Sequence, residues 1–173
     1  CPESRGLGDV YKRQIKYGVA YAKNRQKVFE DTSLDMVITN FEAVNFLVKN
    51  QQLLTNFTNL VIDEFTAFKN KDAKRSKNIK TLSTLFRRRI GMSGTPNTNS
   101  ILDLWHPVHL IDDGQHLGSR FYSYRHQVCT PQFNGFANVW TDKPGIEEVV
   151  ANQLKDITIP VSYTHLRAHE TLD

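Results

Sequence analysis

Three short apolar runs, separated by segments of helical periodicity, are the sequence feature that most limits which folds this chain of 173 residues can adopt. The runs are Leu34–Asn40, "NLVIDE" at 59–64 and Arg88–Gly94. Apolar runs of this length predict buried strands. Strands that alternate with helices predict β-α-β units and a parallel sheet with flanking helices, an α/β fold. Because the runs are apolar on both faces, we expect both faces of these strands to be buried.

The rest of the chain supplies weaker signals. A short β-prone run lies at Val19–Tyr21. Apolar residues recur at helical spacing, or helix-forming residues dominate, in six other segments. These segments are 23–31, 41–50, 71–86, 101–109, 119–128 and 145–154. Asn99 or Ser100 can cap the fourth of them. Thr130–Gly145 is the least regular stretch and predicts a long loop or an insertion.

One short inverted DNA repeat can account for both ends of the chain. Codons that can encode "DVYKRQ" at 9–14 have a reverse complement that encodes "VSYTHL" at 161–166. The repeat is similar to the end sequence that transposase-based library preparation adds to sequencing inserts. We therefore expect residues 1–14 and 160–173 to be adaptor-derived, and residues 15–159 to be a native insert cut from a longer gene.

Charge and cysteine usage set the expected surroundings. The net charge is +4, and no apolar run is long enough to span a bilayer, so we expect no membrane partner. Cys129 is the one cysteine of the insert, which favours a reducing, cytoplasmic setting. Nine residues between positions 69 and 89 are basic, and Asp72 is the one acidic residue in that stretch. They fit either a solvated helix face or a track for a phosphate backbone.

Polar residues end all three apolar runs. The run ends are Thr39-Asn40, Asp63-Glu64 and Ser93-Gly94-Thr95. Open parallel sheets bind ligands at the carboxyl ends of their strands. An aspartate there can hold the magnesium ion of a nucleotide through water, and a neighbouring glutamate can orient or deprotonate the attacking water. Taken alone, the acidic pair also fits a strand end followed by a solvated turn.

The context of these residues resembles the Swi/Snf-type branch of superfamily-two helicases. "VIDEFTAFKN" at 61–70 is similar to motif II, and "RIGMSGTPNTNSILDLWHPVHLID" at 89–112 is similar to motif III. "MVITNFEAV" at 36–44 is similar to motif Ib. The resemblance covers 36–127. Two departures are Phe65, where related helicases usually carry a small residue, and Thr66.

The resemblance implies a role for each matched position. Asp63 would bind the Mg²⁺ of MgATP through water, and Glu64 would activate the attacking water. Ser93, Gly94 and Thr95 would couple the ATP site to the DNA groove. Thr39 and Asn40 would contact the nucleic acid. Lys69 and Asn70 are likewise assigned to nucleic-acid binding.

The resemblance also implies what the chain lacks. No G-x-x-x-x-G-K-[S/T] phosphate loop occurs in the sequence. We therefore expect residues 15–159 to be a partial RecA-like helicase lobe one, without its first strand and phosphate loop. The parent would be an ATP-dependent translocase on duplex DNA, with a second helicase lobe in the same chain. The 173 residues alone would neither hydrolyse ATP nor move on DNA.

Other functions remain open at this point. An RNA or DNA unwinding helicase of superfamily two shares the same motifs. A metal-dependent nuclease could use Asp63 and Glu64, but two-metal nucleases need further carboxylates, and the other two strand ends offer hydroxyls and an amide. A third alternative is a DNA-binding module without catalytic activity. The presence of both Asp63 and Glu64 argues against it, because such a module would not need them.

Overall fold

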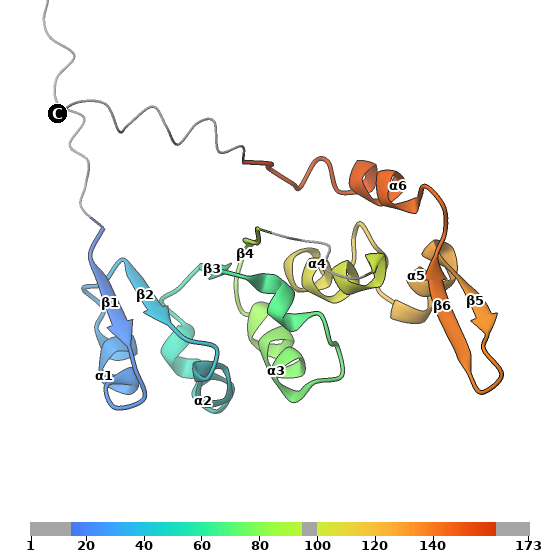
Figure 1. The fold of residues 1–173 in the computed structure, drawn as a ribbon. Helices are drawn as coiled ribbons and strands as arrows, with labels where there is room; N and C mark the ends of the chain where they lie inside the picture. Colours follow the sequence, from blue (N-terminus) through green and yellow to red (C-terminus); the bar gives the residue numbers. More distant parts are fainter. Residues whose placement is uncertain (1–14, 95–99, 162–173) are drawn as a thin grey trace, which may run out of the picture.

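The computed structural model describes residues 15–94 and 100–161, and its first half consists of two parallel strand pairs (Figure 1). β1 (Tyr17–Ala20) pairs with β2 (Met36–Thr39), and α1 (Arg25–Glu30) connects them. β3 (Asn59–Ile62) pairs with β4 (Arg88–Gly91). The predicted parallel strands with flanking helices are confirmed, but as two pairs rather than one continuous ladder.

Helical segments connect the first strand pair to the second and also connect the two strands of the second pair. α2 (Ala43–Lys49) and the 3-10 helix η1 (Gln51–Leu54) lie between β2 and β3. The 3-10 helix η2 (Phe65–Phe68) and α3 (Lys74–Ser83) lead from β3 to β4. In Figure 1, α1, α2 and α3 lie on the same side of the strands.

The strands bury only this helix-covered face. Val37, Leu60 and Ile62 pack into a core with the apolar residues of the helices. Alternate residues point the other way. Among them Ile38, Val61 and Ile90 are each about half exposed, at 45%, 54% and 51%. The expectation that both strand faces are buried is therefore wrong for the described residues, because the helices that contact the strands cover one side.

The second half of the described chain forms a separate core. It contains η3 (Ile101–Leu104), α4 (Trp105–Asp112), α5 (Phe121–Val128), β5 (Cys129–Phe133), β6 (Asn138–Asp142) and α6 (Ile146–Gln153). Ser100 caps η3, as predicted, by accepting a hydrogen bond from the Leu102 amide at 3.2 Å. Within the described ranges no helix combines the length and hydropathy needed to cross a bilayer.

The long loop predicted for Thr130–Gly145 is wrong, and the alternative of an insertion stays a prediction. β5 and β6 pair there as an antiparallel hairpin, from Cys129 opposite Asp142 to Phe133 opposite Asn138. Asn134-Gly135 starts the connection, and Gly135 has a φ of 94°. Such positive φ values cost glycine little. An Asn-Gly pair between β-forming residues is a hairpin signal that the sequence does contain.

His106 joins α4 to η2 and predicts an acid-sensitive fold. Its buried Nδ1 donates to the Phe68 carbonyl at 2.6 Å. Burial lowers the pKa of His106 from 6.5 to about 4. The unfolded chain therefore takes up a proton that the folded chain excludes, so stability is complete above pH 6.5 and falls as the pH drops toward 4. We expect a loss of about 3 kcal/mol.

Urea unfolding at about pH 7 and about pH 4.5 measures this loss. His106→Asn retains an N–H donor and does not titrate, so its unfolding midpoint should change less between the two pH values. Equal losses in the variant and the original chain would contradict the assignment of the acid sensitivity to His106.

Candidate functional site

The carboxyl ends of β3 and β4 lie side by side. The Met92 amide donates to the Ile62 carbonyl at 2.8 Å, and the Phe65 amide donates to the Met92 carbonyl at 3.0 Å. Asp63 and Glu64, between these two links, are exposed to solvent. The backbone just beyond β3 is therefore fixed against the start of the segment that holds Ser93 and Gly94. The structure brings these four predicted site residues to one edge.

Glu64 has an unusual backbone conformation. Its φ and ψ are 46° and 50°, in the left-handed region, and among described non-glycine residues only Asp113 shares a positive φ. The Asp63 carboxylate accepts a hydrogen bond from the Glu64 amide at 3.0 Å. A non-glycine residue in this region costs on the order of 1–3 kcal/mol, and such residues gather at functional sites. The turn therefore directs the two acids into solvent at some energetic cost.

Phe65 fits its position because the neighbouring strand offers a glycine. A Cβ on Gly91 would lie 2.5 Å from Cδ2 of the Phe65 ring. The ring thus occupies space that any larger residue at position 91 would need. This explains physically how the chain accommodates a bulky residue directly after the acidic pair.

Gly91→Ala should therefore destabilise the chain by about 1–3 kcal/mol, because the new methyl group overlaps the Phe65 ring. In Phe65→Ala that overlap is absent, so Gly91→Ala made in this background should cost much less. Thermal unfolding of the four chains in this double-mutant cycle measures the coupling. Strictly additive effects would contradict the described contact.

Thr39 and Asn40 end the other strand pair. The Thr39 hydroxyl donates to the Ala20 carbonyl at 3.0 Å. Asn40 accepts from Arg25 Nη2 at 3.4 Å. In the described part of the chain, no ladder joins this pair to β3 and β4. Thr95, the last residue of the predicted coupling motif, lies outside the described residues.

Lys69 and Asn70 have partners within the chain. Lys69 Nζ forms an ion pair with Asp103 in η3 at 2.9 Å. The Asn70 side chain accepts from the Asp72 amide at 3.0 Å in the turn before α3. Lys69 and Asn70, which are predicted to contact nucleic acid, therefore also hold η2 and the start of α3 in place.

The basic cluster between 69 and 89 is partly neutralised. Lys80 and Arg89 both pair with Asp113, whose two cationic partners hold the pKa of its carboxyl well below the usual range. Arg75 donates to the Ala67 carbonyl and lies over the Phe41 and Phe68 rings. Exposed cations of the cluster without an acidic partner in the described structure are Lys74, Arg75, Lys77, Arg87 and Arg88. The phosphate track therefore stays a prediction, and four of its nine cations, Lys69, Lys71, Lys80 and Arg89, already have acidic partners.

Asp142 is a site-supporting residue that sequence reasoning missed. Its carboxylate accepts from Ser100 Oγ at 2.8 Å and from the Ile101 amide at 2.9 Å. Cys129 Sγ also donates to it at 3.2 Å. The hairpin thereby anchors the chain at the point where it emerges from the predicted coupling segment. No signal in the sequence located Asp142, because its partners lie far away along the chain.

The acidic pair suits a magnesium ion that is mainly held by water and phosphate. Mg²⁺ often takes only one or two protein carboxylates, together with waters and substrate phosphates. Asp63 and Glu64 are exposed and have no cationic partner within the described ranges. No group of three or more His, Cys, Asp or Glu residues suited to a metal occurs in that part of the chain. The donor set therefore fits nucleotide-borne Mg²⁺ better than an all-protein metal site.

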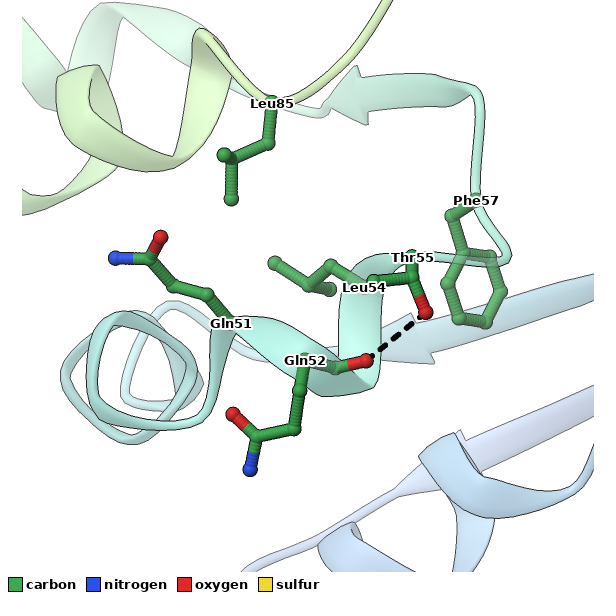
Figure 2. A pocket seen from close by; sticks show the side chains of 6 residues that line it. All are labelled: Gln51, Gln52, Leu54, Thr55, Phe57 and Leu85. Atoms are coloured by element: carbon green, nitrogen blue, oxygen red, sulfur yellow. Dashed lines mark hydrogen bonds between the residues drawn. The ribbon is translucent and has the colours of Figure 1, made fainter.

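A separate hollow of about 300 Å³ lies at the other end of β3 (Figure 2). Leu54, Phe57 and Leu85 give it an apolar wall, and Gln51, Gln52 and Thr55 complete the lining. The Thr55 hydroxyl donates to the Gln52 carbonyl at 3.0 Å. Because these residues precede β3 and β4, the hollow faces away from the strand ends that carry Asp63 and Glu64, and it contains no charged group.

Comparison with known proteins gives a consistent group of matches. The family model described as the SNF2-related domain matches residues 9–155. The chromatin-remodeling ATPase INO80 of Saccharomyces cerevisiae (strain YJM789) is 34% identical over 91 residues, which is 53% of this chain. Protein p41 of Acyrthosiphon pisum secondary endosymbiont phage 1 is 25% identical over 111 residues, or 61% of this chain.

A solved structure shares the fold. The Sulfolobus solfataricus SWI2/SNF2 ATPase core in complex with dsDNA aligns over 84% of this chain with a TM-score of 0.61 and 22% identity. This likeness confirms the predicted partial RecA-like architecture. The chain spans 28% of that solved chain, 24% of p41 and 5% of INO80.

Proposed function

This chain belongs to the SNF2-related domain family, and on that premise we propose that it forms part of an ATP-dependent DNA translocase. The observation that carries the proposal is the fixed pairing of the β3 and β4 ends, which holds an exposed Asp-Glu pair beside Ser93 and Gly94. ATP hydrolysis in such a protein is phosphoryl transfer to water, which depends on positioning and charge stabilisation.

Asp63 and Glu64 divide the chemistry between them. Mg²⁺ bound with ATP would neutralise charge on the phosphates. Asp63 would hold that ion through water, and its carboxylate accepts a hydrogen bond from the Glu64 amide. Glu64 accepts a proton from the attacking water. The left-handed turn at Glu64 supports this division, because it re-aims the second acid relative to a continued strand.

Nucleic acid and coupling roles follow from the remaining positions. We assign Ser93, Gly94 and Thr95 to coupling between the ATP edge and the DNA groove, with a second helicase lobe completing the site. Thr39, Asn40, Lys69 and Asn70 are assigned to duplex DNA. The hydrogen bonds that Thr39 and Asn40 make within the chain support a positioning role for the β2 end. With these roles, the protein would act inside the cell, in association with DNA.

The 173-residue chain itself should not hydrolyse ATP, because its sequence has no phosphate loop to cradle the nucleotide. Phosphate release from the purified chain, measured with Mg²⁺ and duplex DNA, should equal the rate without protein. Hydrolysis above that background would contradict this account of the chain.

The complete protein tests the function as a whole. We expect ATP hydrolysis that duplex DNA stimulates, and no DNA cutting with Mg²⁺ in the absence of ATP. Cutting without ATP would favour the nuclease, for which the described residues lack additional clustered carboxylates. DNA binding without hydrolysis would favour the non-catalytic module, and strand separation of a forked substrate would favour the unwinding helicase.

A further inference from the structure

Cationic and aromatic side chains contact one another from Lys71, before α3, through α5 to Trp140 on β6. Lys71 Nζ lies 5.6 Å from the ring centroid of Tyr122, and the Arg125 guanidinium lies 5.0 Å from the same centroid. Arg125 also lies 4.0 Å from the Trp140 ring on β6. We call this series the aromatic–cationic stripe; its members are Lys71, Tyr122, Arg125, Trp140 and Phe133, with Phe136 at its end.

The hairpin extends the stripe away from the body of the molecule. Phe133 pairs with Asn138 and Pro131 pairs with Trp140, so Phe133 and Trp140 lie on the same hairpin face. Phe133 and Trp140 are diagonal neighbours on the two paired strands, and residues so placed lie about 7–8 Å apart, within reach of aromatic side chains. In Figure 1 the tip of the β5–β6 hairpin extends beyond the neighbouring elements.

The aromatic rings at the tip are exposed, and hydrogen bonds hold the backbone that carries them. Phe133 is 71% exposed and Phe136 is 97% exposed. The Asn134 side chain accepts from the amides of Phe136 and Ala137 at 3.1 and 2.9 Å. The backbone of the tip is therefore fixed before any partner arrives, which reduces the entropy lost on binding.

The charge around the stripe favours a polyanion. Residues 119–143 carry Arg120, Arg125 and Lys143 against a single acid, Asp142. The Asp142 carboxylate is directed at Ser100 and Ile101. Lys71 has an ion pair with Asp72 but keeps its position over the aromatic rings. Trp140 is partly buried, whereas Tyr122, Phe133 and Phe136 are exposed. Exposed rings beside cations suit single-stranded nucleic acid, with bases stacked on the rings and phosphates near the charges.

We propose that the aromatic–cationic stripe binds unpaired bases of single-stranded DNA. The inference rests on the proposed function only in taking DNA as the polymer that the protein meets. Because Asp142 bonds Ser100 and Ile101, a strand bound on the stripe would lie on a hairpin that is anchored directly after the predicted coupling segment. The stripe would thus hold single-stranded DNA beside the lobe, whatever process supplies that strand.

Binding of an end-labelled thymine oligonucleotide of about 20 nucleotides to the 173-residue chain tests the proposal. Fluorescence anisotropy should show an affinity that falls about 5- to 100-fold in Tyr122→Ala and in the Phe133→Ala/Phe136→Ala double variant. Val139→Ala, on the opposite hairpin face, is the matched control and should bind as the original chain does. Thermal unfolding of each variant checks that the fold is intact.

Trp140 supplies a second readout within the same experiment. The chain has two tryptophans, and the other one, Trp105, is buried and donates to the Gly118 carbonyl. The oligonucleotide should therefore quench the Trp140 emission, and Trp140→Phe should abolish most of that quenching. Oligonucleotide binding that is equal in the aromatic variants and the Val139→Ala control would overturn the proposal.

A duplex probe separates this inference from the proposed function. Binding to duplex but not to the thymine oligonucleotide would overturn the stripe alone. Aromatic-dependent binding to the oligonucleotide without duplex binding would support the stripe and count against the duplex partner, while binding to neither would count against both. If Phe133→Ala/Phe136→Ala changed only the oligomeric state, a contact between copies would replace the proposal.

Discussion

Glu64→Gln in the complete protein should lower the rate of ATP hydrolysis by about 10²- to 10⁴-fold, the range that a positioned general base contributes. The amide retains the shape of the side chain but does not accept a proton from water. ATP binding should persist, since Asp63 and the backbone turn are unchanged. Steady-state phosphate release and equilibrium binding of labelled ATP measure the two quantities separately.

The control for this substitution is Glu148→Gln, at an exposed position on α6. It makes the same chemical change far from the strand ends and should leave the rate unaltered. If Glu64→Gln kept most of the hydrolysis rate, the acid would have only a structural role in the turn, and the assignment of Glu64 as the base would be wrong.

Phe68→Ala should destabilise the 173-residue chain by about 3–5 kcal/mol. Phe68 is fully buried, packs edge-on against Phe41 at 4.9 Å, and accepts hydrogen bonds at its carbonyl from Ser76 and His106. Truncation leaves a cavity where η2, α3 and α4 meet. Because small domains have only about 5–15 kcal/mol of stability in total, much of the variant should be unfolded at moderate temperature.

Phe136→Ala is the matched control, since it deletes the same side chain at a position that is 97% exposed. Its unfolding midpoint should remain within the small range typical of surface substitutions, about 0.5 kcal/mol. Urea unfolding followed by circular dichroism compares the two variants. Similar midpoints for Phe68→Ala and Phe136→Ala would show that η2 is not part of the folded core.

Local sequence patterns were sufficient for the elements but not for their long-range partners. The runs ending at Thr39, Glu64 and Gly94 correctly indicated β2, β3 and β4, because strand burial leaves a short-range apolar pattern. The helical spacing of apolar residues in 101–109 also agrees with the observed burial of Leu104, Trp105 and Val108. By contrast, the bond from Ser100 to Asp142 spans 42 positions and leaves no periodic trace.

The site shows the same division. The adjacency of Asp63 and Glu64 to Ser93 was predictable, since parallel pairing brings carboxyl ends to one edge. The left-handed conformation of Glu64 was not, because glutamate has no preference for that region. The fit of Phe65 against Gly91 depends on the register between β3 and β4, which places Ile62 opposite Gly91. The pairing of Lys69 with Asp103 likewise arises from tertiary packing.

Metal-directed cleavage in the complete protein tests the central claim most directly, namely that nucleotide-borne Mg²⁺ lies at the carboxyl ends of β3 and β4. Fe²⁺ replaces Mg²⁺ in the presence of ATP, peroxide and ascorbate generate radicals at the metal, and mass spectrometry locates the backbone cuts. We predict ATP-dependent cuts near Asp63-Glu64 and near Ser93-Gly94, suppressed by excess Mg²⁺. Cuts near Asn59 and Arg88, at the amino ends of the same strands, would contradict the account.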